Sequence, residues 1–136
     1  MKKIVLLLVL CICFSFPVYA DELPKVSSTV VEPRASYVFV STGAFISKSA
    51  YGGECDLVSK GSGTITISVQ KYASASNSWV TMAGPSSKSF SNTSIPIYEK
   101  SKTLTKGKWR CKASISAKVG SHSDSRTVYS GTLTVN

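Results

Sequence analysis

Residues 108–119 alternate without a break between two chemical kinds of side chain. One set is apolar or small: Trp109, Cys111, Ala113, Ile115, Ala117 and Val119. The other is charged or hydroxylated: Lys108, Arg110, Lys112, Ser114, Ser116 and Lys118. Successive side chains of a β-strand point to opposite faces of its sheet, so this segment predicts a strand with one face in a core. A slip of one residue would bury its charges, which fixes its register.

Other segments predict strands as well, and none has the apolar spacing of a helix. Residues 64–70 alternate cleanly, and residues 79–82 are their predicted hairpin partner. Further strand signals lie at 37–40, 45–46, 55–58, 95–98 and 127–135. About seven short strands joined by turn signals are typical of a sandwich, so we predict an all-β, immunoglobulin-like or fibronectin-like antiparallel β-sandwich.

Three local features refine this prediction. We interpret Gly52 and Gly53 as a turn that precedes the strand at 55–58. Pro96 cannot donate a backbone hydrogen bond, which favours an edge position for its strand. In the last strand, Tyr129 is expected to share the inward face with Leu133 and Val135.

The N-terminus has the layout of a secretory signal peptide. Lys2 and Lys3 precede an apolar run over residues 4–16, and Ala20 ends a plausible cleavage site. The run of about 13 residues is shorter than the roughly 20 that span a bilayer as a helix. We therefore predict a cleaved signal peptide at 1–20, a linker or lead-in strand at 21–35 and a β-sandwich domain at 36–136. No later segment is long and apolar enough to span a membrane, so the product is expected to be secreted, either released or retained at the cell wall.

Two cysteines, Cys55 and Cys111, remain after removal of the signal peptide. In an oxidising compartment such a pair predicts a disulfide, which would stabilise the domain by about 4 kcal/mol. A zinc site is the competing use of cysteine, but His122 is the single histidine of the chain and two thiols with one imidazole leave a four-ligand site incomplete. We predict no metal and no cofactor.

Several short motifs resemble a group of small secreted proteins from clostridial-type Gram-positive bacteria. They are 53–55 (Gly-Glu-Cys), 67–72 (Ile-Ser-Val-Gln-Lys-Tyr), 78–79 (Ser-Trp), 106–111 (Lys-Gly-Lys-Trp-Arg-Cys) and 128–131 (Val-Tyr-Ser-Gly). The resemblance covers residues 34–135 and implies export and an immunoglobulin-like sandwich. It assigns no catalytic or binding residue.

Catalytic groups are scarce in the sequence. His122, Asp124 and the neighbouring serines superficially offer a nucleophile, a base and an acid, but all lie in one short polar turn whose composition turn formation explains. The chain has no glycine-rich phosphate loop and no calcium loop. We therefore predict that the protein is not an enzyme.

A row of cations is the one distinctive chemical feature. Its members are Lys106, Lys108, Arg110 and Lys112. By strand alternation they would line one outer sheet face about 6.5–7 Å apart and attract anionic cell-wall polymers or glycans. The plainer interpretation is a solvated face that keeps the domain soluble. Nucleic acid is disfavoured, because Trp109 points to the core and leaves no evident stacking platform on the basic face.

These observations predict a secreted or cell-envelope-associated binding module of unknown ligand. With the signal peptide removed, the chain keeps 14 of its 16 basic residues and all seven acidic ones, which gives a net charge of +7. A bacteriocin-like antagonist would suit the same small size and basic charge. An adhesive or structural subunit is the third hypothesis, in which residues 26–31 are donated to a neighbouring copy. Ligand, oligomeric state and release or retention stay open.

Overall fold

The structure is a computed structural model that describes residues 25–31 and 36–136, with the side chains of 29–31 left out. The segment predicted to be a signal peptide lies outside the described residues. The described residues form nine strands: β1 (Val26–Val31), β2 (Phe39–Ile46), β3 (Ala50–Leu57), β4 (Gly61–Ala73), β5 (Ser78–Thr93), β6 (Ile97–Ser101), β7 (Gly107–Val119), β8 (His122–Tyr129) and β9 (Leu133–Val135). Among the described residues there is no helix long and apolar enough to cross a membrane.

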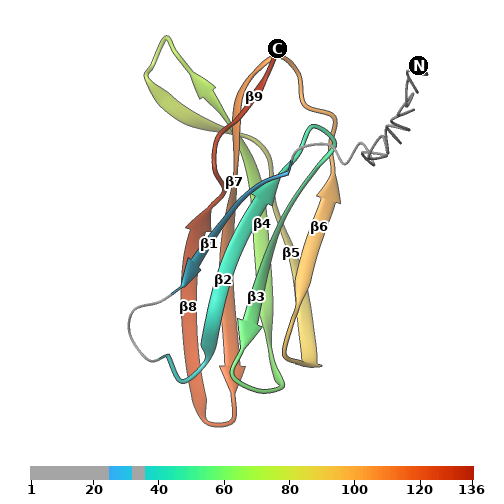
Figure 1. Cartoon of the computed structure of the whole chain (residues 1–136), viewed down its shortest axis with the longest axis vertical. Coiled ribbons are helices and arrows are strands. Elements are labelled where there is room, and N and C mark those ends of the chain that lie inside the picture. Colours follow the sequence, from blue (N-terminus) through green and yellow to red (C-terminus); the bar gives the residue numbers. More distant parts are fainter. Residues whose placement is uncertain (1–24, 32–35) are drawn as a thin grey trace, which may run out of the picture.

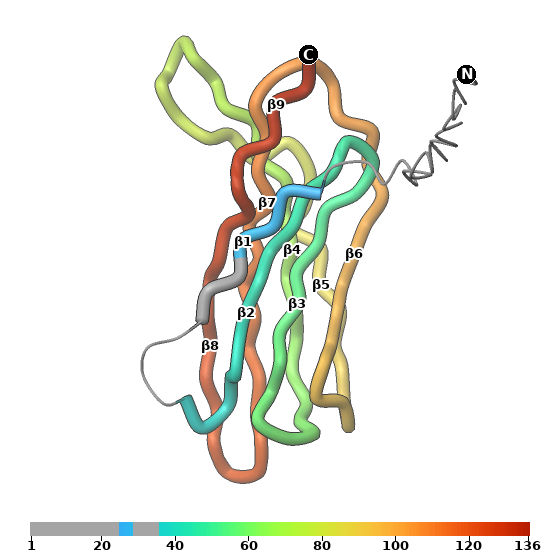
Figure 2. Tube along the Cα trace, in the orientation of Figure 1, coloured from blue at the N-terminus to red at the C-terminus, as the bar shows by residue number. Residues whose placement is uncertain are grey.

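The strands form two antiparallel sheets that face each other (Figures 1 and 2). The small sheet has the order β1-β2-β3-β6, and the large sheet has the order β5-β4-β7-β8, with β9 pairing the start of β7. The prediction of an all-β antiparallel fold is confirmed, with nine strands in the described part in place of about seven. The predicted hairpin of β4 and β5 also forms, and its closed end projects past the two sheets (Figure 1).

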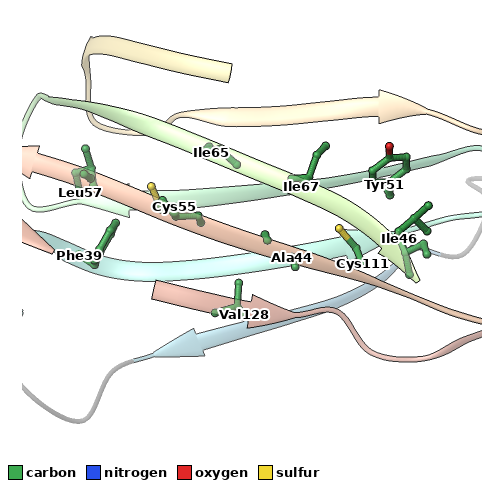
Figure 3. Close-up of a cluster of buried hydrophobic side chains, with 14 of the residues drawn as sticks. Phe39, Ala44, Ile46, Tyr51, Cys55, Leu57, Ile65, Ile67, Cys111 and Val128 are labelled. Atoms are coloured by element: carbon green, nitrogen blue, oxygen red, sulfur yellow. The ribbon is translucent and has the colours of Figure 1, made fainter. Parts of the chain in front are cut away.

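The core lies between the sheets and follows the alternation of β7. The inward side chains of β7 are buried, from Trp109 at 2% exposure to Val119 at 8%. The other core residues are Val38, Phe39, Ala44, Ile46, Tyr51, Cys55, Leu57, Ile65, Ile67, Val69, Leu104, Val128 and Leu133. Figure 3 shows several of them in one continuous cluster. The register predicted for β7 is therefore confirmed.

Two strand predictions need correction. Tyr129 does not share the inward face with Leu133, because the chain leaves the sheet between β8 and β9 and the two strands pair with different parts of β7. Val128 fills the core position, and Tyr129 is 39% exposed on the outer face. The strand predicted at 95–98 begins two residues later, at Ile97, so Pro96 precedes β6. The place of β6 at the edge of the small sheet agrees with the expectation for proline.

Gly52 and Gly53 lie within β3 and do not form the predicted turn. A Cβ atom at Gly52 would stand 2.3 Å from Cζ of Phe45, whose ring lies against this strand. A Cβ atom at Gly53 would stand 2.7 Å from Cβ of Ala113 in the facing sheet. Glycine is required here for close approach of neighbouring groups, a use of glycine in strands that mimics a turn signal in the sequence.

The predicted disulfide is absent, and Cys55 and Cys111 are both buried free thiols. The packing of the sheets explains why. The Sγ of Cys111 donates a hydrogen bond of 3.3 Å to the carbonyl oxygen of Gly52, which is three residues, or roughly 10 Å of strand, from Cys55. Disulfides need Cα atoms within about 7 Å. Figure 3 shows the two sulfur atoms toward opposite ends of the cluster.

We expect both thiols to be inert in the native protein and reactive after unfolding. Burial is the largest cause that raises the pKa of each thiol to about 12, and the thiolate is the form that reacts. Iodoacetamide at neutral pH should leave Cys55 and Cys111 unmodified in buffer and alkylate both in guanidinium chloride. Peptide mapping by mass spectrometry reads out each site. A 55–111 cross-linked peptide would contradict the assignment.

Substitution of Gly53 tests the close contact between the sheets. Gly53→Ala should lower the free energy of unfolding by about 1–3 kcal/mol, because the new methyl group meets Ala113. Gly43→Ala on the neighbouring strand is the matched control, since its Cβ would meet only ordinary contacts at 3.4 Å or more. Adding Ala113→Gly to Gly53→Ala should recover part of the loss. Equal urea midpoints for the two single variants would refute this account.

Candidate functional site

The predicted cation row lies on the outer face of the large sheet, with one exception. Lys108, Arg110 and Lys112 belong to β7 and alternate with buried residues, so they face away from the core. Lys106 is exposed but lies before the strand, and Gly107 with a φ of 141° separates it from the alternating run. The structure therefore brings three of the four predicted residues into line.

Arg110 lies in a cluster of side chains from four strands. Its guanidinium carbon is 4.4 Å from the centre of the Trp79 ring on β5 and 4.3 Å from that of Tyr129 on β8. Its Nε donates a hydrogen bond of 2.8 Å to Oε1 of Gln70 on β4. Gln70 in turn donates from Nε2 to Oγ1 of Thr81 at 3.4 Å. Ring contacts and hydrogen bonds together hold the guanidinium in one orientation.

The guanidinium of Arg110 is charged and has hydrogen-bond donors that its bond to Gln70 does not use. Partial burial lowers the pKa of Arg110 from its ordinary value, and the neighbouring Tyr129 acts in the opposite direction. Arginine stays protonated in proteins, and only one of its five N–H donors is used in the bond to Gln70. The remaining donors form a planar fork of the kind that binds carboxylate, phosphate or sulfate.

The aromatic rings around Arg110 correct one inference from the sequence. Strand alternation placed Trp109 in the core, which is confirmed, and from this the basic face was expected to have no aromatic platform. Trp79 and Tyr129 nevertheless stand on this face, brought there by neighbouring strands. Tyr72 packs against Trp79 in a T-shaped contact with 5.4 Å between ring centres.

Beyond this cluster the outer face is covered by hydroxyl groups. The register of four adjacent strands places two rows across the sheet: Ser89, Thr64, Ser116 and Ser125 in one, and Ser87, Thr66, Ser114 and Thr127 in the other. Neighbouring hydroxyls within β4–β5 and within β7–β8 contact each other at 2.7 to 3.4 Å. The spacing is about 4.8 Å between strands and about 6.6 Å along them.

The middle of this hydroxylated face is hollowed. Three hollows of about 220, 200 and 210 Å³ adjoin one another, because neighbouring hollows share lining residues. The shared residues are Thr64, Thr66, Ser114 and Ser116, which line the gap between β4 and β7. We call this continuous depression the hydroxyl trough. Each hollow is smaller than a typical small-molecule site of about 300–1,000 Å³, whereas the trough as a whole is long and open.

Cations stand at both ends of the hydroxyl trough. Lys112 lines the hollow next to Arg110, and Lys118 lines the hollow at the other end. A further hollow continues past Lys118 to Lys60. Within the described residues, no aspartate or glutamate lines any of these hollows. The trough is therefore a hydroxyl floor between positive ends. One further cation, Arg126 of β8, lines the middle hollow, where it is ion-paired with Asp124 at 2.8 Å.

The opposite outer face carries acidic groups. Glu54 and Asp56 alternate with buried residues of β3, and Glu99 stands opposite Gly52 on the neighbouring strand β6. Asp56 accepts a hydrogen bond of 3.0 Å from Oγ of Ser41. These three carboxylates thus lie on the small sheet, away from the hydroxyl trough, so a polyanion that approaches the trough does not face them.

Of the residues considered for catalysis, His122 and Asp124 do not lie in the predicted turn, because β8 already begins at His122 and pairs with β7 from there. Both are engaged in structural contacts. The His122 ring stacks on Tyr37 with 4.9 Å between ring centres. Asp124 accepts from Nη1 of Arg126 at 2.8 Å and from Oγ of Ser36 at 3.4 Å. In the described part of the chain there is no group of three or more metal-ligating side chains.

Sequence reasoning found the cations of this face and missed its other parts. The alternating hydroxyls of 64–68 and 114–116 were visible in the sequence as outward residues. Their union into one floor depends on β4 lying beside β7, a pairing between segments about 50 residues apart in sequence that no local pattern encodes. The roles of Trp79, Gln70 and Tyr129 depend on the same long-range register.

Comparison with protein-family models, with curated proteins and with solved structures found no match for this chain. The assignment of a site therefore depends on the geometry described above.

A double-mutant cycle measures how firmly Arg110 is held. Arg110→Ala and Trp79→Ala should each lower the free energy of unfolding, and the two should couple by about 0.5–1 kcal/mol, because the cation–ring contact is lost once either partner is removed. The cycle of Lys88→Ala with Trp79→Ala is the control, since the Nζ of Lys88 lies 6.0 Å from the ring centre of Tyr98 instead. Urea unfolding supplies the energies. Coupling indistinguishable from the control would show that the contact does not position the guanidinium.

Proposed function

We propose that this chain is a non-catalytic binding module, secreted or associated with the cell envelope, that holds anionic cell-surface polymers along the hydroxyl trough. The observation that carries the proposal is the pairing of a carboxylate-free trough with cations at its ends, Lys112 and Lys118. Arg110 extends the line of cations at one end, with its fork oriented by Trp79, Tyr129 and Gln70.

The shape of the surface favours a polymer over a compact ligand. From Arg110 to Lys118 the strand rises eight residues, roughly 27 Å, and the hollows between them are shallow and connected. A small anion would contact one cation at a time, whereas a chain molecule contacts all of them together. Several weak contacts along one chain add up to useful affinity.

Export to the cell surface is part of the proposal and is supported by the sequence alone. Lys2, Lys3 and the apolar run that follows them have the layout of a signal peptide. Outside a cell, the polymers within reach are acidic glycans, teichoic acids and anionic lipid headgroups. All of them are attracted to a protein with a net positive charge.

The sandwich class is also a proposal. The large-sheet order β8-β7-β4-β5 supports an immunoglobulin-like arrangement, because such domains place their last two strands beside an early central strand. The small sheet departs from that order, since β3 follows β2 directly and occupies the position between β2 and β6. A fibronectin-like or other sandwich therefore remains the alternative.

The two rival functions draw less support from contacts. A subunit that exchanges strands would donate β1, which pairs with β2 of its own chain from Val26 opposite Ile46 to Val31 opposite Ser41. A bacteriocin-like antagonist is compatible with the basic charge, but no contact of the described residues favours it. Growth inhibition by the purified protein would support the antagonist, and a binding module should be inert in that assay.

Retention on an anionic cell-wall fraction tests the proposal. Replacing the lysines of the basic face, Lys108→Gln, Lys112→Gln and Lys118→Gln, should lower the NaCl concentration at which the protein elutes, because each contact with a polyanion is screened by salt. The matched control removes three lysines elsewhere, Lys48→Gln, Lys100→Gln and Lys102→Gln. The control should elute close to the unmodified protein.

Two results would contradict the proposal. Equal weakening by the two triple variants would assign retention to net charge rather than to this face. Retention unaffected by salt would exclude charge as its basis. Circular dichroism of both variants checks that the fold is retained.

A further inference from the structure

The hydroxyl trough has a chemistry of its own that cations alone do not explain. Its floor consists of two rows of four serine or threonine residues, each row crossing β5, β4, β7 and β8. Each hydroxyl is one donor and two acceptors, so a surface of hydroxyls bonds best to a ligand that offers donors and acceptors together. Sugar rings carry hydroxyl groups of this kind along their whole length.

The charge spacing of the trough points to a sparsely charged polymer. Between Lys112 and Lys118 the strand rises six residues, roughly 20 Å, and the outward residues between them are Ser114 and Ser116. Nucleic acids carry a phosphate every few ångströms along each strand. Between Lys112 and Lys118 these phosphates would meet one cation of the hollows, Arg126, and it is already ion-paired with Asp124. A polymer whose charges are separated by neutral, hydroxylated units matches both the ends and the floor.

The pairing of the floor hydroxyls makes the site rigid. The contacts Thr66–Ser87 at 2.7 Å and Ser114–Thr127 at 3.0 Å fix the hydroxyl positions before a ligand arrives. The central pair, Thr66 and Ser114, faces the hollow between β4 and β7. A preformed surface loses less side-chain freedom when it binds, which favours recognition of a regular chain.

Resting on the proposed function above, we propose that the ligand class of the hydroxyl trough is a linear acidic polysaccharide in which carboxylate-bearing sugars alternate with neutral ones. The polymer lies along β4 and β7. Its carboxylates pair with Arg110, Lys112 and Lys118, and its neutral rings bond to the serine and threonine hydroxyls between them. Arg110 is the terminal anchor, because its fork is held in place by Gln70 and the two rings.

Calorimetry with defined polymers tests this inference. Hyaluronate, with one carboxylate per disaccharide, is compared with polyphosphate and single-stranded DNA at equal charge concentration, and with neutral dextran, all in about 0.15 M NaCl. Hyaluronate should bind about tenfold more tightly than polyphosphate or DNA, which is the effect of roughly 1.4 kcal/mol of added hydrogen bonding. Dextran should bind more weakly than hyaluronate.

A variant that removes hydroxyls and keeps every cation separates the two kinds of contact. Thr64→Val, Thr66→Val, Ser114→Ala and Ser116→Ala together should weaken hyaluronate binding about tenfold and leave polyphosphate binding within about twofold. The matched control removes exposed hydroxyls elsewhere: Ser49→Ala, Ser101→Ala, Thr103→Val and Thr132→Val. If the fourfold variant does not fold, Thr66→Val with Ser114→Ala carries the same test, with an expected loss of about threefold.

Each outcome decides something. Binding of all polyanions in proportion to their charge, with no effect of the hydroxyl variant, would overturn the polysaccharide inference and leave the proposed function standing. Preference for polyphosphate or DNA would also overturn it. Failure of every polymer to bind would remove both the inference and the proposed function. Selective loss of hyaluronate binding in the trough variant, with the control unchanged, would support both.

Discussion

The alternation of β7 is the constraint on which the rest of the structure depends. This strand pairs with β4 on one side and with β8 and β9 on the other, so it is central to the large sheet. Its inward residues, from Trp109 to Val119, fill the core, and its outward residues supply the cations and half of the trough floor. A shift by one residue would expose the core and bury Lys108, Arg110, Lys112 and Lys118, so fold and site are fixed by the same register.

The sequence could predict those features that depend only on the alternation of side chains within a single strand. Parity within one strand assigns each side chain to a face, and on that basis the burial of Trp109 and the outward direction of Arg110 were foreseeable. Which strands become neighbours is set by long-range packing. The rings of Trp79 and Tyr129 contact Arg110 from segments about 30 residues before it and about 20 after it. No local sequence pattern predicts these contacts.

The incorrect predictions have a common physical origin. The cysteines were predicted to form a disulfide and the glycines to form a turn, which are common roles of these residues. In both cases the packing of the facing sheet gives them a different role. Cys111 stands level with Gly52, so the thiol that it was expected to join lies too far along β3. Gly53 is a glycine because Ala113 leaves no room for a side chain. Both outcomes depend on the offset between β3 and β7, which a single sequence does not specify.

The distribution of charge gives the two outer faces different properties. The trough has hydroxyls and the paired Arg126 between its positive ends, while Glu54, Asp56 and Glu99 lie on the small sheet. An approaching polyanion meets cations at the trough and no carboxylate among its lining residues, which favours contact with that face. A cationic face alone would favour the most densely charged polymer. Between Lys112 and Lys118 the hollows are lined mainly by hydroxyls, and their one cation, Arg126, is already paired with Asp124. Closely spaced phosphates would therefore gain few charge pairs there, and selectivity shifts toward chains that exchange hydrogen bonds with the floor itself.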